Sequence, residues 1–363
     1  MSSKKFVKIT ISLIIVLLLL IMSFVIVIDP FFQYHKPLNG LSYNIDEPRY
    51  HNAGLLKSFE YNSIITGTSM TQNFKVSEAN LLFNENFIKT SLNGANYEDI
   101  NKLLEVAFNE NKEIKNVIRG LDYSKLYSEA IYIYDEKLPL YLYDNNLIND
   151  VYYFFNIDVL KKCIKDVLMY TMNGNKTTVM DEYDSWYAIT GILPNAEHYN
   201  VFIFSKENVL NSYKRAEISN KEKYLTQTQK NEVIININNN VINIAKENPQ
   251  TTFYIFFPPY SVSYWDNQIR EGRFYSVLEA KYIAVEEMLK QDNIKLFSFE
   301  SEKKIITDLN NYTDQAHYSE KINSLLLKYM SEDEYLLTKD NYEDIFKKDE
   351  EFLLNYNYDA IYE

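Results

Sequence analysis

The longest apolar run of the chain extends from Ile9 to Ile28 and contains no charged residue. At about 1.5 Å per residue, a helix of this length spans roughly 30 Å, the thickness of the hydrocarbon core of a bilayer. Lys4, Lys5 and Lys8 precede the run, whereas acidic residues dominate the stretch after it. Because positive charge favours the cytoplasmic side, the pattern predicts one transmembrane helix with the N-terminus inside and the rest of the chain outside.

A cleaved signal peptide is the alternative for this segment. The apolar core of a signal peptide is typically about 7–15 residues long and ends at small residues. Here the run ends in Phe-Val-Ile-Val-Ile-Asp-Pro, and the single cysteine, Cys163, lies far downstream. We therefore expect a cytoplasmic N-terminus at residues 1–8 and an uncleaved anchor at residues 9–28. We expect no second span, because no later run is apolar over about 18 residues.

Beyond the anchor, short apolar runs alternate with stretches of helical periodicity, which is the pattern of a parallel sheet covered by helices. The predicted strands are 63–66, 87–92, 114–118, 252–257 and 295–299. The predicted helices are 97–109, 227–247, 274–291 and a last one from His317 or Tyr318 to about Met330. We therefore predict an α/β domain over residues 31–330, a three-layer sandwich with a parallel central sheet.

The alternation stops between residues 124 and 223, a stretch rich in Tyr and Phe that is hard to assign. We interpret it as a large aromatic insertion in one core, with two separate domains as the alternative. Residues 331–363 are acidic and aromatic, and we expect them to form a C-terminal tail on the surface.

The composition narrows the class of protein. The 363-residue chain is 46% hydrophobic and contains one cysteine, so no intrachain disulfide can form and core burial must hold the fold together. A net charge of −13 without a basic cluster argues against nucleic acid as a partner. The four histidines are scattered and no H-x-x-x-H or C-x-x-C spacing occurs, so we predict no metal and no cofactor.

Candidate chemistry lies at strand ends, because the loops of an open α/β sheet gather at its carboxyl edge. The first strand runs into Gly67-Thr68-Ser69, which places the Ser69 hydroxyl on a strand-to-helix turn. Taken alone, such a serine is as often the N-cap of the next helix. After the last core strand, Asp314 and His317 are three residues apart. A serine nucleophile needs a base and a partner that orients the base, and these two residues supply both; a cap beside a surface histidine is the alternative.

The order of these segments resembles the SGNH (GDSL-type) hydrolase family. The first block of that family is Gly-Asp-Ser, which residues 67–69 match except that Thr68 replaces the aspartate. The glycine of the second block matches Gly94, and the Asp-x-x-His of the last block matches Asp314 and His317. The resemblance implies an SGNH/flavodoxin-like sandwich in which these two residues form a triad with Ser69. It also implies an oxyanion hole that includes the N–H groups of Ser69 and Gly94.

The third block departs from the family pattern. Gly-x-Asn-Asp is usual there, and its Asn side chain is another oxyanion donor, whereas this chain reads Gly120-Leu121-Asp122-Tyr123. An ionised Asp cannot donate a hydrogen bond. Asp122 must therefore stay protonated, turn away to another partner, or leave the role to Asn93 or Asn96. The loss of one oxyanion donor costs about 10²–10³ in rate.

The anchor, the aromatic insertion and a Pro-Pro turn after the strand at 252–257 make the chain similar to one branch of this family. That branch comprises membrane-anchored proteins that modify cell-surface polymers, such as the D-alanyl-lipoteichoic acid transfer protein and the alginate O-acetylation proteins. The likeness implies a cell-surface polysaccharide or teichoic acid as substrate and a membrane-bound O-acyltransferase as partner. Tyr260, Tyr264 and Trp265 follow the turn and form either a sugar-binding platform or, as is more common, an aromatic cover for the core.

Two functions from different classes follow. In the first, the protein is an extracytoplasmic serine acyl-esterase or O-acyltransferase that acts on a cell-surface polymer. In the second, the fold is kept but catalysis is lost, and the protein holds a polymer or a partner enzyme at the membrane. Asp122 is the residue that favours the second function.

Overall fold

The computed structural model describes residues 2–110, 113–127, 138–186, 202–219 and 221–362 of the chain. The chain divides into two compact units. Unit 1 comprises residues 1–60 and 137–179, and unit 2 comprises residues 61–136 and 180–363. The range 124–223, predicted as one insertion, is thus shared between the two units.

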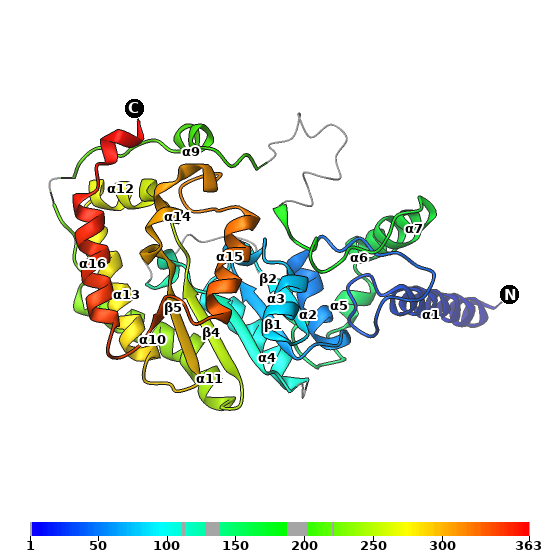
Figure 1. The fold of residues 1–363 in the computed structure, drawn as a ribbon. Coiled ribbons are helices and arrows are strands. Elements are labelled where there is room, and N and C mark those ends of the chain that lie inside the picture. Colours follow the sequence, from blue (N-terminus) through cyan, green and yellow to red (C-terminus); the bar gives the residue numbers. More distant parts are fainter. Residues whose placement is uncertain (1, 111–112, 128–137, 187–201, 220, 363) are drawn as a thin grey trace. The chain divides into compact units, whose positions relative to one another are not determined.

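Unit 2 is built on a six-stranded sheet with the strand order β2-β1-β3-β4-β5-β6 (Figure 1). The strands are β1 (Ser63–Gly67), β2 (Phe87–Ser91), β3 (Asn116–Gly120), β4 (Thr252–Phe257), β5 (Ile294–Ser298) and β6 (Leu336–Leu337). The first five are parallel to one another, and β6 pairs antiparallel with β5. The prediction of an α/β protein with a mainly parallel sheet is confirmed.

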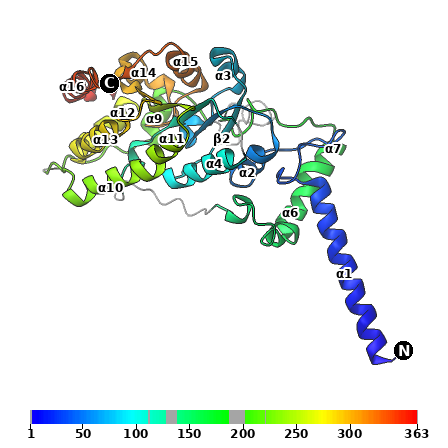
Figure 2. The same ribbon diagram turned by 90° about the horizontal axis from the view of Figure 1, so that it is seen from below.

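Helices cover both faces of this sheet (Figure 2). One face carries α4 (Tyr97–Asn109), α10 (Gln227–Ile237), α11 (Asn243–Glu247) and α13 (Phe274–Met288), and the other carries α3 (Val76–Phe83) and α15 (Glu320–Ser331). All residues of β1 and β2 are buried, as expected for strands with helices on both sides. The other α-helices in the described part of unit 2 are α9 (Lys206–Ser212), α12 (Val262–Arg270), α14 (Lys303–Thr307) and α16 (Tyr342–Asn355).

Local sequence signals explain where several of these helices begin. Asn96 caps α4, because its side chain accepts a hydrogen bond from the Asp99 N–H while the Asp99 carboxylate reaches back to the Asn96 N–H. Thr226 and Gln229 form the same reciprocal arrangement at the start of α10. The C-terminal range 331–363 contributes β6 to the edge of the sheet and α16 to the surface.

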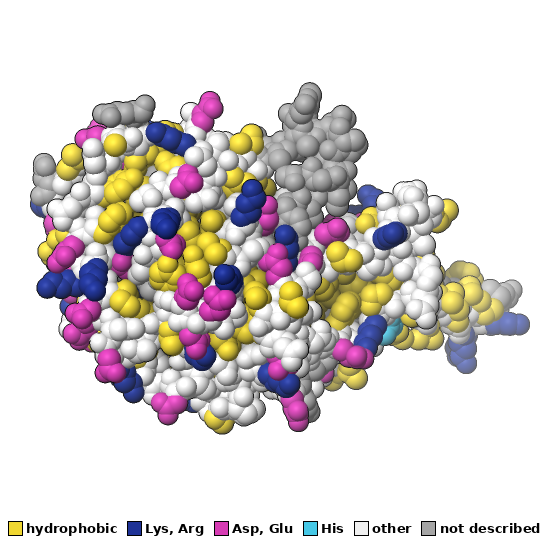
Figure 3. All heavy atoms as spheres, viewed as in Figure 1, with side chains coloured by type: hydrophobic (Ala, Val, Ile, Leu, Met, Phe, Trp, Pro, Cys, Tyr) yellow, Lys and Arg dark blue, Asp and Glu magenta, His cyan; other side chains and the backbone are white. Residues whose placement is uncertain are grey.

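Unit 1 contains α1 (Ser3–Ile28), α2 (Pro48–Ser58), α5 (Val151–Phe154), α6 (Ile157–Lys162) and α7 (Tyr170–Met172), with a π-helix at Cys163–Met169 between the last two. Within the described ranges, α1 is the one helix long and apolar enough to cross a membrane. Only 11% of its most apolar window is buried by the rest of the protein, so α1 is not a core helix. Apolar side chains cover it, and lysines mark its N-terminal end (Figure 3). The predicted anchor at 9–28 lies within α1.

Candidate active site

Ser69 lies at the exit of β1, the second strand from one edge of the sheet. The turn requires glycine at position 67, where φ is +148° and an added Cβ would lie 2.7 Å from Cγ2 of Thr71. A short 3₁₀ helix, Ser69–Thr71, follows at once, so the Ser69 side chain emerges at the carboxyl edge of the sheet. It is half-buried, which leaves the hydroxyl accessible.

His317 and Asp314 lie beside this serine. His317 Nε2 is 2.8 Å from Ser69 Oγ, and His317 Nδ1 is 2.6 Å from Asp314 Oδ2. Because a carboxylate only accepts hydrogen bonds, Asp314 requires the proton to be on Nδ1, and Nε2 is then the acceptor that faces the serine hydroxyl. The structure thus brings together three residues that the sequence separates by up to 248 positions.

The predicted helix start at His317 or Tyr318 is wrong, because α15 begins at Glu320. Residues before it form a tight turn in which Asp314 Oδ1 accepts the N–H groups of Ala316 (2.9 Å) and His317 (2.8 Å). These bonds replace helical bonds and fix the carboxylate beneath the imidazole.

The pKa of Asp314 is lowered from its ordinary value. Burial would raise it, but the hydrogen bonds and charge of His317, together with the two backbone N–H groups, outweigh this effect. The carboxylate therefore stays ionised at neutral pH and is able to stabilise an imidazolium on His317.

Gly94 lies in the loop after β2 with φ +68°, a conformation that favours glycine. Lys125 Nζ donates to its carbonyl oxygen at 3.2 Å. Among the described residues, no group accepts a hydrogen bond from the backbone N–H of Ser69 or of Gly94. Both predicted oxyanion donors are therefore uncommitted.

Asp122 faces two hydroxyl groups. Thr68 Oγ1 donates to Asp122 Oδ2 at 2.6 Å, and the Tyr260 hydroxyl donates to Oδ1. Both carboxylate oxygens act as acceptors, so the structure does not offer Asp122 as an oxyanion donor. Of the two suggested substitutes, the Asn96 side chain caps α4, while Asn93 is exposed on the loop.

The three predicted sugar-binding residues belong to an aromatic cluster in the core. Trp265 is fully buried, and Tyr260 is 5% exposed. Their rings pack against Tyr123, with centroid separations of 5.5 Å for Trp265 and 5.3 Å for Tyr260. Only Tyr264 is half-buried. The burial of these side chains agrees with an aromatic cover for the core and not with a sugar-binding platform.

Trp186, which the sequence did not single out, packs edge-on against His317 with a centroid separation of 5.0 Å. Its indole N–H donates to Gln72 Oε1 at 2.8 Å, and its backbone N–H donates to Asn73 Oδ1 at 2.9 Å. The segment directly after the candidate nucleophile thus holds the tryptophan that flanks the candidate base.

Lys89, on β2, fixes this segment from inside the protein. Its fully buried ammonium donates to the carbonyls of Gln72 at 2.6 Å and Phe74 at 3.1 Å. Burial lowers the pKa of Lys89 to about 7 from 10.5. In the strand pattern Lys89 is simply a polar position, but in the structure it fixes the loop that follows Ser69.

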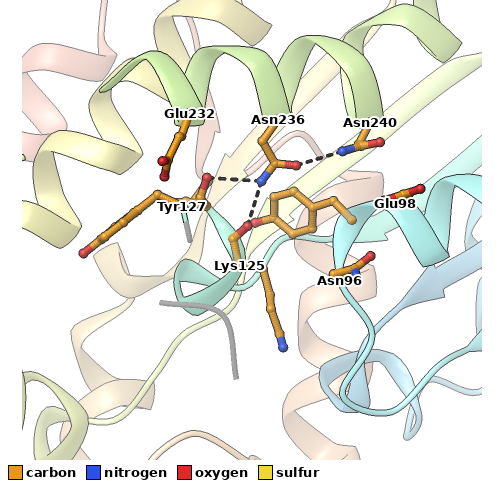
Figure 4. Close-up of a pocket in the computed structure, with 9 residues that line it drawn as sticks. Asn96, Glu98, Lys125, Tyr127, Glu232, Asn236 and Asn240 are labelled. Carbon is orange, nitrogen blue, oxygen red and sulfur yellow. Dashed lines mark hydrogen bonds between the residues drawn. The ribbon is translucent and has the colours of Figure 1, made fainter. Parts of the chain in front are cut away.

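A cavity of about 210 Å³ lies beside the Gly94 loop, between the start of α4 and the face of α10 (Figure 4). Nine residues line it: Asn96, Tyr97, Glu98, Lys125, Leu126, Tyr127, Glu232, Asn236 and Asn240. Asn236 Nδ2 donates to the Lys125 carbonyl at 2.8 Å, which fixes one wall to α10. Lys125 joins the cavity to the Gly94 loop through its bond to the Gly94 carbonyl.

Within the described ranges, no group of three or more His, Cys, Asp or Glu side chains is placed to hold a metal ion. Cys163 is a buried thiol, and burial raises its pKa to about 12. It belongs to unit 1 and takes no part in the site.

No family model matches the chain, and no curated protein matches it.

Proposed function

We propose that this protein is a membrane-anchored serine esterase or O-acyltransferase with an SGNH-like three-layer domain. The observation that carries the proposal is the chain of two hydrogen bonds from Ser69 through His317 to Asp314, 2.8 and 2.6 Å long. A hydroxyl that faces an imidazole, itself oriented by a carboxylate, is the arrangement that nucleophilic acyl transfer needs.

In the proposed reaction, Ser69 Oγ attacks the carbonyl carbon of an acyl ester while His317 Nε2 takes the hydroxyl proton. The oxyanion of the tetrahedral intermediate accepts hydrogen bonds from the N–H groups of Ser69 and Gly94. Collapse breaks the ester bond, and the leaving alcohol takes the proton from His317. A hydroxyl of the acceptor, or water, then attacks the acyl-serine with His317 again as base, which frees Ser69.

Two backbone donors serve the oxyanion in this scheme, because Asp122 is occupied by Thr68 and Tyr260. A site with one donor fewer is expected to be about 10²–10³ slower towards simple esters. This favours an enzyme that relies on binding a specific acceptor over a general esterase.

The acceptor that suits the cavity is a polyhydroxylated unit such as a sugar or a polyol. Carboxamides and carboxylates from α10 and the start of α4 offer both donors and acceptors. A cell-surface polysaccharide or teichoic acid carries such units.

We place α1 across the membrane with Lys4, Lys5 and Lys8 on the cytoplasmic side, so that the chain after α1 lies outside the cytoplasm. The acyl donor in this scheme is delivered through the membrane by a partner of the membrane-bound O-acyltransferase kind. A protein that only binds the polymer or this partner is the second candidate, and the aspartate at position 122 favours it.

Labelling of the full-length protein in detergent with a fluorescent fluorophosphonate separates the two candidates. An enzyme labels, and Ser69→Ala abolishes the labelling. Ser324→Ala is the matched control, because the Ser324 hydroxyl donates only within α15, to the carbonyl of Glu320. Equal labelling of wild type and Ser69→Ala, or none in either, contradicts the enzyme.

A further inference from the structure

Unit 1 exposes an unusual set of apolar side chains beyond α1. Ten large apolar residues within the segment 140–172 are exposed: Leu140, Leu147, Ile148, Val151, Tyr152, Phe155, Ile157, Ile164, Met169 and Met172. Exposed clusters of this kind in a folded protein mark surfaces that contact a protein or a membrane.

The tip of this surface is a preformed loop between Leu142 and α5. Leu147 and Ile148 project from it with exposures of 74% and 82%. Hydrogen bonds within the loop fix its shape: Asp144 accepts the Asn146 N–H at 3.0 Å and the Asn149 side-chain amide at 2.8 Å. The loop presents its apolar residues without needing to rearrange.

The helical stretch 157–172, formed by α6, the π-helix and α7, adds a second apolar face. Val159, Cys163 and Val167 are buried against unit 1. The opposite face exposes the apolar residues at 157, 164 and 172, with Lys161 and Lys165 among them. Apolar side chains interleaved with lysines are typical of helices that lie in a membrane interface.

This surface is tied to the C-terminal end of α1. The Tyr153 hydroxyl, on the buried side of α5, donates to the buried Asp29 carboxylate at 2.7 Å, one residue after α1 ends. The same carboxylate accepts the backbone N–H groups of Gln33 (3.0 Å) and Tyr34 (2.7 Å). Both α5 and the π-helix contact α1, and α6 lies beside its end in both views (Figures 1 and 2).

We propose that this surface lies in the bilayer interface, in the leaflet where α1 emerges, so that unit 1 is held to lipid by a helix and by a second, shallow contact. The inference rests on the proposal that α1 spans the membrane, because only then does the surface next to the end of α1 lie at the level of the lipid headgroups. The lipid need not be anionic, since the four acidic residues of the segment 140–172, Asp144, Asp150, Asp158 and Asp166, outnumber its three lysines, Lys161, Lys162 and Lys165.

Site-specific labels on the full-length protein test the depth of this surface. In a Cys163→Ala background that keeps the wild-type unfolding temperature, one cysteine at a time is introduced and labelled with an NBD fluorophore. The positions are Ile148, Leu81 in unit 2 as a control of equal exposure (82% and 83%), and Leu17 in α1. Each protein is reconstituted into phosphatidylcholine vesicles with and without phosphatidylglycerol.

We expect the label at 148 to shift to the blue on transfer from detergent to vesicles, and to lose most of its quenching by aqueous iodide. Lipids spin-labelled near the headgroup should quench it, in both lipid mixtures alike. The label at 81 should stay water-accessible, and the label at 17 should be quenched by lipids labelled deep in the chain.

A label at 148 that stays as accessible to iodide as the label at 81, while the label at 17 is deep, overturns this inference and leaves the anchor intact. A label at 17 that remains in water shows instead that the anchor itself has failed. Shielding at 148 that requires a co-purified membrane protein and is missing in lipid alone assigns the surface to a protein partner, which also overturns it. Hydrogen exchange of the unlabelled protein is the second measurement: protection of amides 145–158 in vesicles over detergent is expected, and its absence counts against lipid contact.

Discussion

The two units of this protein treat apolar side chains in opposite ways. In the described part of unit 2, large exposed apolar residues are scattered over the whole unit: Leu81, Leu82, Ile203, Ile218, Tyr224, Ile235, Leu354 and Tyr362. In unit 1, ten are gathered within residues 140–172, next to the end of α1. The exposure of apolar surface costs free energy in water but not in an apolar environment. Exposed apolar side chains are thus scattered in unit 2 and concentrated in one segment of unit 1, as the proposed lipid contact of unit 1 requires.

The units also differ in what their buried polar groups do. In unit 2, Lys89, Asp122 and Trp186 use buried hydrogen bonds to shape the surroundings of Ser69 and His317. In unit 1, the buried Asp29 carboxylate accepts hydrogen bonds from the residues that follow α1 and from the Tyr153 hydroxyl. The buried polar groups of unit 2 thus surround the candidate site, and those of unit 1 hold the chain at the end of α1.

The largest expected effect separates these two roles directly. Ser69→Ala should lower hydrolysis of an activated aryl ester by at least about a thousandfold, because the nucleophile is lost. Ile148→Ser in unit 1 should leave the rate in detergent unchanged, since all three triad residues belong to unit 2. The measurement compares the initial rates of ester hydrolysis of the two purified variants and of wild type. A comparable loss in Ile148→Ser would show that the chemistry depends on unit 1.

The next effect concerns the buried acceptor in unit 2. Asp122→Asn replaces one of two acceptor oxygens by a donor, so either Thr68 or Tyr260 loses its partner. We expect a loss of about 1–3 kcal/mol in the free energy of unfolding, measured with denaturant.

A double variant sharpens this test. Thr68→Asp combined with Asp122→Asn restores an acceptor opposite a donor, and it installs the residues of the SGNH pattern at both positions. The double variant should lose less stability than the sum of the single variants. A strictly additive result would show that the two side chains do not interact.

Acid should affect the two units in sequence. His51, in α2, is 1% exposed, and burial lowers its pKa to about 3 from 6.5. Between these values the unfolded chain binds a proton that the folded unit does not, so stability falls as the pH drops below 6.5. The loss at pH 5 is about 2 kcal/mol.

Asp314 in unit 2 changes stability in the same direction, but only at lower pH. Its pKa is lowered, so its stabilising contribution is complete above 3.8 and disappears only as the pH falls through the lowered value. Denaturant unfolding at pH 5 and 7.5 should therefore show a loss in wild type that His51→Gln reduces. An equal pH dependence in both proteins would exclude His51 as the cause.

The smallest effect concerns Trp186. Trp186→Ala should lower the rate of fluorophosphonate labelling about tenfold, because His317 loses the ring that restricts its rotamer, while the nucleophile remains. A spectroscopic readout needs no substrate: Trp265→Phe leaves Trp186 as the single tryptophan of the chain. Its fluorescence should change in His317→Gln, because this substitution removes the ring that packs against the indole. An unchanged emission spectrum would mean that the two rings are not in contact.

Local patterns predicted a large part of the fold. The predicted strands 63–66 and 252–257 lie within or match β1 and β4, and the predicted strand 87–92 ends one residue after β2. Short, mainly apolar runs are typical of strands that are covered on both faces. The predicted helix 97–109 matches α4, and Asn96 and Asp99 form the cap at its start. The start of the last helix was wrong, because the turn held by Asp314 competes with helical bonding over the same residues.

Other features depend on contacts between distant segments, and no local pattern contains them. The assignment of residues 137–179 to unit 1 depends on such contacts, as when Tyr153 binds Asp29. Trp186 is tied to residues 72 and 73 and meets His317 only in the folded chain. The partners of Asp122 come from two other strand ends.

By itself, the sequence determined the apolar helix near the N-terminus, the alternating α/β order, and Ser69, Asp314 and His317 as candidates. These follow from short-range chemistry: the length of an apolar run, the period of burial, and the types of residue at strand ends. Only the tertiary structure decided that the three candidates lie within hydrogen-bond distance, that Asp122 accepts rather than donates, and that an apolar surface accompanies the end of α1. Each of these depends on contacts between side chains that are far apart in the sequence. Such contacts cannot be predicted from the spacing of residues along the chain.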